Sequence, residues 1–137
     1  MAKKQLIHKL DVGRTGMPGS RGYTAQAYRA GNWVVMSGQT AYTLDGEVVG
    51  IGDPAAQARQ ACENIKRLME LAGGTMDDVV KLVVYVTDRA HRAVVYPIIR
   101  SYFGAVRPCG TGVVVQGLAR PEFLVEIDAW GFIDDPD

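Results

Sequence analysis

The chain has 137 residues, of which 47% are hydrophobic and 22% are charged, which is typical of a single globular domain over residues 1–137. Fifteen basic residues balance fifteen acidic ones, so no net positive field favours binding to nucleic acid or to an anionic membrane surface. The two cysteines, Cys62 and Cys109, lack CxxC spacing and do not make a disulfide framework, which favours a reducing, cytoplasmic location. The N-terminal residues form no apolar signal region, and no apolar run approaches the roughly 20 residues of a membrane span.

The first third of the chain alternates between β-type runs and turn signals. Gly31–Asn32 and Asp45–Gly46 are typical of tight turns, the first of them between two strands of a hairpin. Residues 11–22 are rich in Gly and Pro and are predicted to form a loop, which at this length is often functional. Three strands are therefore expected, over residues 4–10, 23–30 and 33–41.

The clearest helix of the chain is predicted over residues 53–72. Asp53 suits the N-cap, and Pro54 suits the first helical position, where a missing N–H removes no helical hydrogen bond. Gly73–Gly74 ends the pattern. Small and aliphatic residues recur at helical spacing and predict close packing of one face on a sheet: Ala58, Ala61, Ile65, Leu68 and Ala72.

The second half of the chain predicts three more strands and one more helix. An apolar run over 79–88 favours a central strand, and an amphipathic helix follows within 89–104, with Pro97 expected in its first turn or at a kink. Residues 111–116 and 123–132 are the last two strands. This order of elements predicts an α+β fold with the helices on one face of the sheet. The other face then needs a cover, which self-association would supply.

Glu126 is the acid that the β pattern explains least. It lies between Val125 and Ile127 in the last strand, on the face opposite the one that faces the core. A carboxylate in that position is either a solvated or salt-bridged acid, or a group in a partly dry cleft that holds a water molecule and passes protons. The pattern alone does not separate these two possibilities.

The remaining candidates are weaker. Cys109 would need a base to become a nucleophile, and neither His8 nor His91 is placed beside it by the sequence, so a packing thiol is preferred. Residues 110–112, Gly-Thr-Gly, are too short for a phosphate loop but allow close approach of the backbone to a ligand. No spacing predicts a metal site or a bound cofactor. Three arginines, most simply solvated, could form a small anion site: Arg100, Arg107 and Arg120.

Two motifs of the chain are diagnostic: SGQ after an apolar strand, and LVEI followed by an acid and Ala in the last strand. With these motifs, much of the chain resembles the Rid family, also called YjgF or L-PSP. The resemblance implies a chorismate-mutase-like α+β fold with a mixed sheet, assembled as a homotrimer with clefts between subunits. It also implies cofactor-independent hydrolysis of reactive imines and enamines. The resemblance runs from about Tyr23 to Ile133 and is carried by AGNWVVMSGQT, GGTMDDVVKLVVYVTD and GLARPEFLVEIDAW.

The family's functional residues map onto this chain in part. In the family a glutamate of the last strand positions the attacking water, and an arginine before the penultimate strand grips the substrate carboxylate through a bidentate pair. Glu126 matches that glutamate, and Ser37 and Gln39 match the SGQ motif. Tyr23 or Thr24 aligns with an N-terminal tyrosine of the family. We therefore assign Glu126 and Ser37 to catalysis.

Two departures from the family pattern change the expected ligand. The family has Pro-x-Arg and then Ser or Thr, whereas Gly110 stands here in place of the arginine, and Tyr96 replaces an asparagine of the deaminase subgroup. Loss of a bidentate arginine from a buried carboxylate costs about 2–5 kcal/mol, so ordinary 2-imino acids should bind poorly. A divergent member with a less anionic or more aromatic ligand is expected. The predicted substrate-binding residues are Tyr23, Gln39, Tyr96, Arg107, Cys109, Gly110 and Thr111.

Three functions follow from these residues and from the resemblance. The first is a hydrolase or deaminase acting on an imine, enamine or related activated C–N compound in an intersubunit cleft. The alternatives are a non-catalytic regulatory trimer that binds a small metabolite, and a ribonuclease or translation inhibitor. The neutral charge and the lack of an aromatic and basic stripe argue against the last. The expected partners are a small molecule and further copies of the chain, with no nucleic acid and no membrane.

Overall fold

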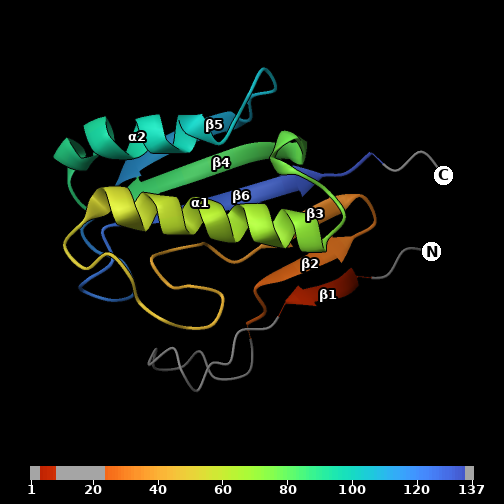
Figure 1. Cartoon of the computed structure of the whole chain (residues 1–137), viewed down its shortest axis with the longest axis horizontal. Coiled ribbons are helices and arrows are strands. Elements are labelled where there is room, and N and C mark those ends of the chain that lie inside the picture. Colours follow the sequence, from red (N-terminus) through yellow and green to blue (C-terminus); the bar gives the residue numbers. More distant parts are fainter. Residues whose placement is uncertain (1–3, 9–23, 135–137) are drawn as a thin grey trace.

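The computed structural model describes residues 4–8 and 24–134, so Tyr23 and the loop predicted over 11–22 lie outside the described residues. The order of strands and helices is the predicted one (Figure 1). The elements are β1 (Lys4–His8), β2 (Ala27–Ala30), β3 (Trp33–Met36), α1 (Pro54–Leu71), β4 (Val79–Val86), α2 (Arg92–Ser101), β5 (Cys109–Val114) and β6 (Val125–Phe132). Short 3-10 turns over Met76–Asp78 and Arg89–His91 precede β4 and α2.

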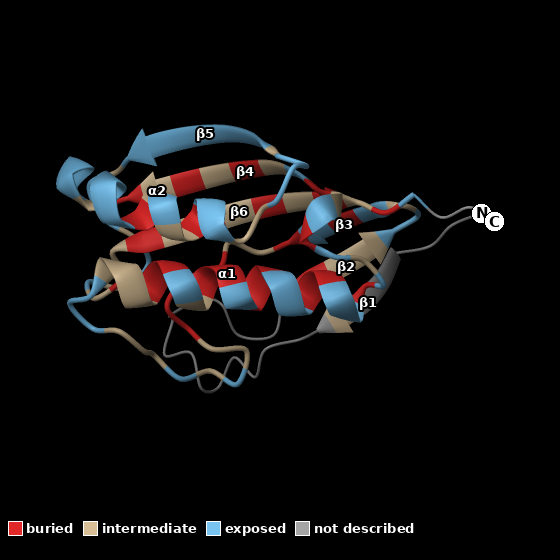
Figure 2. Ribbon diagram, turned by 45° about the horizontal axis from the view of Figure 1, so that its top comes forward, coloured by how far each residue is buried: buried red, intermediate tan, exposed pale blue. Residues whose placement is uncertain are grey.

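The strands form one six-stranded mixed sheet in the order β1-β2-β3-β6-β4-β5. β4 and β5 run parallel, and the other neighbours are antiparallel. Both helices pack on the same face of this sheet, with α1 crossing β6 and α2 lying beside β4 and β5 (Figures 1 and 2). The predicted α+β arrangement is therefore confirmed, and no described helix covers the opposite face.

Helix α1 has the predicted signals at its N-terminus. Asp53 Oδ1 accepts a hydrogen bond from the N–H of Ala56 at 3.1 Å, and Pro54 is the first helical residue. At the other end, Arg29 of β2 donates from Nη1 to the carbonyl of Ala72 at 2.8 Å, which satisfies one of the carbonyls that a helix end leaves open. All five residues of the predicted apolar face are buried.

The alternation predicted for the last strand is also confirmed. Along β6 every second residue is buried under α1, and the residues between them are half-buried on the bare face (Figure 2). The buried set is Val125, Ile127, Ala129 and Gly131, and the half-buried set is Glu126, Asp128, Trp130 and Phe132. Glu126 therefore lies on the side of the sheet that the helices leave open.

Gln57 of α1 is a fully buried polar residue that the sequence analysis did not single out. Its Nε2 donates to the carbonyls of Gly50 at 3.0 Å and of Glu122 at 2.9 Å, and its Oε1 accepts from the N–H of Leu124 at 2.9 Å. All the hydrogen-bonding groups of this amide are thus used, as burial requires. The side chain ties two loops to α1 and fixes the start of β6, and so the position of Glu126.

In helix α2, Pro97 does not lie in the first turn, which was one of the two positions expected for it. The helix begins at Arg92, so Pro97 lies beyond the first turn rather than within it. The proline ring has no N–H to donate to the carbonyl of Ala93, so this helical hydrogen bond cannot form. A 3-10 turn before α2 and packing of its buried Val95 and Ile99 hold the short helix in place.

Several strand boundaries also differ from the prediction, and the differences in β3 and β5 concern predicted site residues. β3 ends at Met36 instead of continuing to residue 41, and Gln39 then forms an isolated bridge with Ile127 of β6. β5 begins at Cys109 and ends at Val114, so Cys109 and Gly110 belong to the strand, whereas the strand predicted over 111–116 did not include them. Parallel pairing with β4 draws these residues into the sheet despite the glycine.

Replacement of Gln57 by Leu should lower the free energy of unfolding by roughly 2–4 kcal/mol, because two carbonyls and one N–H would lose their buried partner. Chemical denaturation measures the change. Lys66→Leu, at an exposed position of the same helix, is the control and should shift the free energy by less than about 0.5 kcal/mol. Equal effects of the two variants would contradict the role given to Gln57.

Candidate functional site

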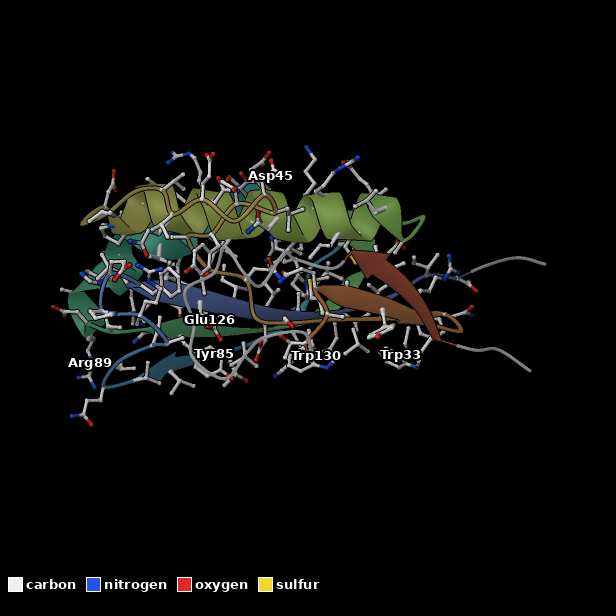
Figure 3. The ribbon with its side chains drawn as sticks, turned by 90° about the horizontal axis from the view of Figure 1, so that it is seen from below. Trp33, Asp45, Tyr85, Arg89, Glu126 and Trp130 are labelled. Atoms are coloured by element: carbon white, nitrogen blue, oxygen red, sulfur yellow. The ribbon has the colours of Figure 1, made fainter. Side chains whose placement is uncertain are left out.

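The bare face of the sheet carries the predicted catalytic acid. Figure 3 shows Glu126, Tyr85, Trp130 and Trp33 on the side of the sheet that faces away from α1. Trp33 is 47% exposed, and its ring meets that of Phe132 edge-to-face with 5.1 Å between centroids. This face thus has an apolar part over β3 and the end of β6, beside a polar part around Glu126.

Two acids on β6 share the space beside Gly38. A Cβ atom added to Gly38 would lie 2.8 Å from the carboxyl carbon of Glu126 and 2.8 Å from Oδ1 of Asp128, closer than real Cβ atoms approach. Gly38 is the middle residue of the SGQ motif, so its lack of a side chain is what admits both carboxylates. The sequence contained this signal in the motif itself, but its reason is visible only in three dimensions.

The electrostatics around Glu126 favour retention of a proton. Burial raises the pKa of Glu126 above its ordinary value, and the neighbouring charge of Asp128 raises it further. Tyr85, the cross-strand partner of Glu126, donates from its hydroxyl to Oδ2 of Asp128 at 3.1 Å, and this hydrogen bond raises the pKa of Tyr85. No described residue donates a hydrogen bond to the Glu126 carboxylate, which leaves its oxygens available to water or a ligand.

Ser37 and Gln39 hold the SGQ segment against its neighbours. Ser37 Oγ donates to the carbonyl of Ala25 at 2.7 Å. Gln39 Nε2 donates to Oε1 of Gln26 at 3.0 Å and to the carbonyl of Ser37 at 2.8 Å. The backbone of Gln39 exchanges two hydrogen bonds of 2.8 Å with Ile127 of β6. The donors of both side chains are therefore used in hydrogen bonds within the protein. These bonds position the segment that lies against Glu126.

A second candidate site lies on the helix-covered face, between α2 and β5. Gly110 and Gly112 of β5 pair with Leu82 and Val84 of β4, which are buried under the helices. Both glycines therefore point towards α2, and Thr111 between them points to the bare face, where its Oγ1 accepts from Lys81 Nζ at 2.8 Å. A solvent-open groove of about 1020 Å³ runs between α2 and these glycines.

Tyr96 and the glycines of β5 fit each other closely. A Cβ atom at Gly112 would overlap the Tyr96 hydroxyl and lie 3.2 Å from ring carbon Cζ, so the tyrosine occupies the space that a side chain would need. At Gly110, by contrast, no heavy atom lies within 4 Å of an added Cβ. The position where the family pattern has its arginine is thus open space. The guanidinium carbon of Arg92 lies over the Tyr96 ring at 5.3 Å from its centroid.

The predicted site residues fall into two groups in one protomer. Glu126 and the Ser37–Gln39 segment lie on the bare face, whereas Tyr96, Arg107 and Gly110 line the α2–β5 groove on the other face. β4 separates the strands that carry Glu126 and Gly110. The two groups therefore do not form a single pocket within one chain.

The other two predicted residues belong to the edge strand. Cys109 is exposed at the start of β5 and lies on the bare face. Thr111 has its side chain on the same face, and other atoms of this residue also border the groove. The arginine trio predicted from the sequence does not come together. Arg120 forms an ion pair with Glu122 and donates to the Tyr42 hydroxyl at 2.7 Å, away from the groove. Arg92 joins the groove instead.

Four contributors to these sites were missed by sequence reasoning: Gly38, Tyr85, Asp128 and Arg92. Two signals were present. Asp128 lies two residues after Glu126, which places both acids on one face of a strand. Arg92 lies four residues before Tyr96 and eight before Arg100, which places the three on one face of a helix. Tyr85 gave no local signal, because its position depends on the pairing of β4 with β6.

Other kinds of site have less support. Among residues 4–8 and 24–134, no three His, Cys, Asp or Glu side chains lie close enough together to hold a metal ion. None of the described helices has the length and apolar character needed to cross a bilayer. Burial raises the pKa of the Cys62 thiol to about 12, so this cysteine stays protonated and is a poor nucleophile.

Comparison with known proteins gives consistent matches over nearly the whole chain. The family model described as endoribonuclease L-PSP matches residues 17–133. A RutC family protein of Pyrococcus horikoshii is 38% identical over 106 residues, which are 77% of this chain and 82% of the relative.

Two crystal structures with a similar fold are of Rid proteins. YyfA of Yersinia pestis, described as a conserved Rid family protein of unknown function, has a TM-score of 0.81 at 28% identity, with 96% of this chain and 100% of that chain covered. RidA of an Antarctic Psychrobacter has a TM-score of 0.78 at 32% identity, with 94% and 99% covered.

A mixed sheet with two helices on one face is thus the YjgF or chorismate-mutase-like fold that these structures share. The chain belongs to the Rid family, also called YjgF or L-PSP, and the resemblance drawn from its motifs is confirmed.

Gly38→Ala tests the contact between the SGQ motif and the two acids. Because the new methyl group meets Glu126 and Asp128, the variant should lose about 1–3 kcal/mol of unfolding free energy. The same change in a Glu126→Ala background should cost less, since the truncated side chain frees the space. Chemical denaturation of the four proteins measures this coupling. An equal cost in both backgrounds would show that the methyl group does not meet Glu126.

Proposed function

We propose that the protein is a cofactor-independent hydrolase that acts on an imine, enamine or related activated C–N compound in a cleft between subunits. The observation that carries the proposal is the Glu126 carboxylate. It is half-buried on a bare sheet face, has a raised pKa, and accepts no hydrogen bond from a described residue. A carboxylate in this state can bind a water molecule and exchange a proton with it.

The chemistry needs only water and one proton carrier. Glu126 accepts a proton from the bound water as the water oxygen adds to the carbon of the C=N bond. The carboxylic acid so formed returns the proton to the nitrogen, which gives a carbinolamine. Glu126 then carries the hydroxyl proton of this carbinolamine to the nitrogen as the C–N bond breaks, so that the amine leaves and the carbonyl product forms. The raised pKa serves the second step, because a carboxylic acid that holds its proton more tightly remains a donor closer to neutral pH.

The division of the site between two sheet faces supports a cleft shared by subunits. A substrate in the α2–β5 groove can approach Glu126 only if that acid comes from a second copy of the chain. The bare face offers an apolar surface for such a copy, since Trp33 and Val35 are 47% and 46% exposed. A homotrimer, with the chain itself and a small molecule as partners and neither nucleic acid nor membrane, is part of this proposal.

A reducing, cytoplasmic setting belongs to the same proposal. Both cysteines are free, with Cys62 buried in the core and Cys109 exposed on the edge strand. An exposed thiol without a partner is best tolerated where thiols are kept reduced.

Two other functions keep specific support. Gly110 in place of the family arginine favours a regulatory trimer that binds a metabolite without turnover. The description of the matching family model, endoribonuclease L-PSP, favours action on RNA, although fifteen basic and fifteen acidic residues give no net attraction for a polyanion. Ammonia release from a panel of imines and enamines separates the proposed hydrolase from both.

Glu126→Gln should reduce ammonia release by at least about 100-fold, because the amide can neither accept nor return a proton. The mass of the assembly in solution should stay unchanged. Asp45→Asn is a matched control, since Asp45 is an exposed acid on the helix side of the molecule (Figure 3), and it should retain full activity. Full activity of the Glu126 variant would rule out the mechanism.

Gly110→Arg should restore the carboxylate grip of the family pattern. The space beside Gly110 is open, so an arginine can enter the groove without displacing a neighbour. The variant should bind 2-imino acids better, with a fall in KM of about tenfold or more, since a charge-assisted hydrogen bond contributes about 1.5–3 kcal/mol. Gly104→Arg, which also borders the groove, is the control. Equal responses would show that added charge, rather than its position, improves binding.

A further inference from the structure

The groove between α2 and β5 exists because two of the three β5 residues on that side are glycines, and the third is Val114. Gly110 and Gly112 face α2, and the wider end beside Gly110 has no heavy atom within 4 Å of an added Cβ. Arg92, Tyr96 and Arg100 follow each other at four-residue steps along α2, so they border the groove as one row.

The charge in this groove is one-sided. Arg107, from the loop before β5, also borders the groove, so three arginines line it. No described Asp or Glu lines the groove, and none of the three arginines forms an ion pair with a described acid. The positive charges of the three arginines repel one another. A bound anion with more than one negative charge attracts all three, so the total electrostatic energy becomes favourable.

Tyr96 gives part of this arrangement a fixed geometry. Its hydroxyl end lies against Gly112, and its ring carries the Arg92 guanidinium at 5.3 Å. A guanidinium over an aromatic ring at this distance is held by cation–π attraction. Arg92 is thus held beside the groove that it borders.

We propose that the α2–β5 groove binds a small molecule through a doubly charged oxyanion, held by Arg92, Arg100 and Arg107. Gly110 stands where the family pattern has an arginine. The positive charge missing there would be supplied by α2 and by the loop before β5. This proposal replaces the less anionic ligand that the sequence predicted. It rests on the proposed function only for the reaction that follows, since binding of the anion does not use Glu126.

Both a phosphate monoester and a dicarboxylate carry such a doubly charged oxyanion. Aromatic probes of similar size, with two charges or with one, test whether the second charge increases affinity. Titration calorimetry at pH 8 with phenyl phosphate, phthalate and benzoate should give at least tenfold tighter binding of one dianion than of benzoate. The affinity for that dianion should fall as salt rises. Equal affinity for benzoate, or no heat with either dianion at millimolar concentration, would overturn the proposal.

The variants locate the site. Arg100→Gln and Arg107→Gln should each weaken binding of the preferred dianion at least tenfold, and both positions are exposed, so folding should be unaffected. Arg89→Gln removes the same charge just before α2 but outside the groove (Figure 3), and it should change the affinity less than twofold. An equal loss in Arg89→Gln would show a general charge effect and refute the site.

A further variant separates this proposal from the proposed hydrolase. Glu126→Gln should bind the dianion as the wild-type chain does, because the acid lies on the opposite face of the sheet. Loss of turnover with binding retained supports both proposals. Retained binding without any turnover in the wild-type chain would support the groove and refute the hydrolase.

Discussion

One constraint governs the molecule: two helices cover one face of a six-stranded sheet, and the other face has no described helix over it. The alternation of a β-strand then sorts the residues of β6 between a dry side and an open side. Glu126 owes its half-buried state to this sorting. Gln57 anchors the start of β6 from within the core, so a buried amide on α1 helps to set the position of an acid on the opposite face.

Local features of the sequence were enough to predict much of the fold. The cap at Asp53, the glycines after α1 and the turn at Gly31 depend on neighbouring residues, and they appear where they were predicted. The boundary of β5 was wrong, because its pairing with β4 overrides the weak strand preference of Gly110. Sequence signals are reliable for caps and turns, whose stability depends on neighbouring residues. They fail for strand boundaries that depend on pairing with a strand distant in the sequence.

The candidate site was harder to predict for the same reason. The resemblance predicts Glu126 and Gly110 in a cleft between subunits. Within one chain the sheet order inserts β4 between their strands, and the register turns them to opposite faces. Neither strand order nor register can be read from one sequence. The departures at Tyr96 and Gly112 also become intelligible only together, because the tyrosine hydroxyl occupies the space of the missing side chain.

The Gly-Thr-Gly segment keeps the groove open only because its two glycines, and not the threonine between them, face α2. Lys81 donates to Thr111 on the bare face, and this contact agrees with the register that turns both glycines inward. A slip of one residue would reverse every side chain of the strand. Cys109, Thr111 and Val113 would then fill the groove. Access of a ligand to the groove therefore depends on the pairing of β5 with β4, and any insertion or deletion that shifted this register by one residue would close the groove.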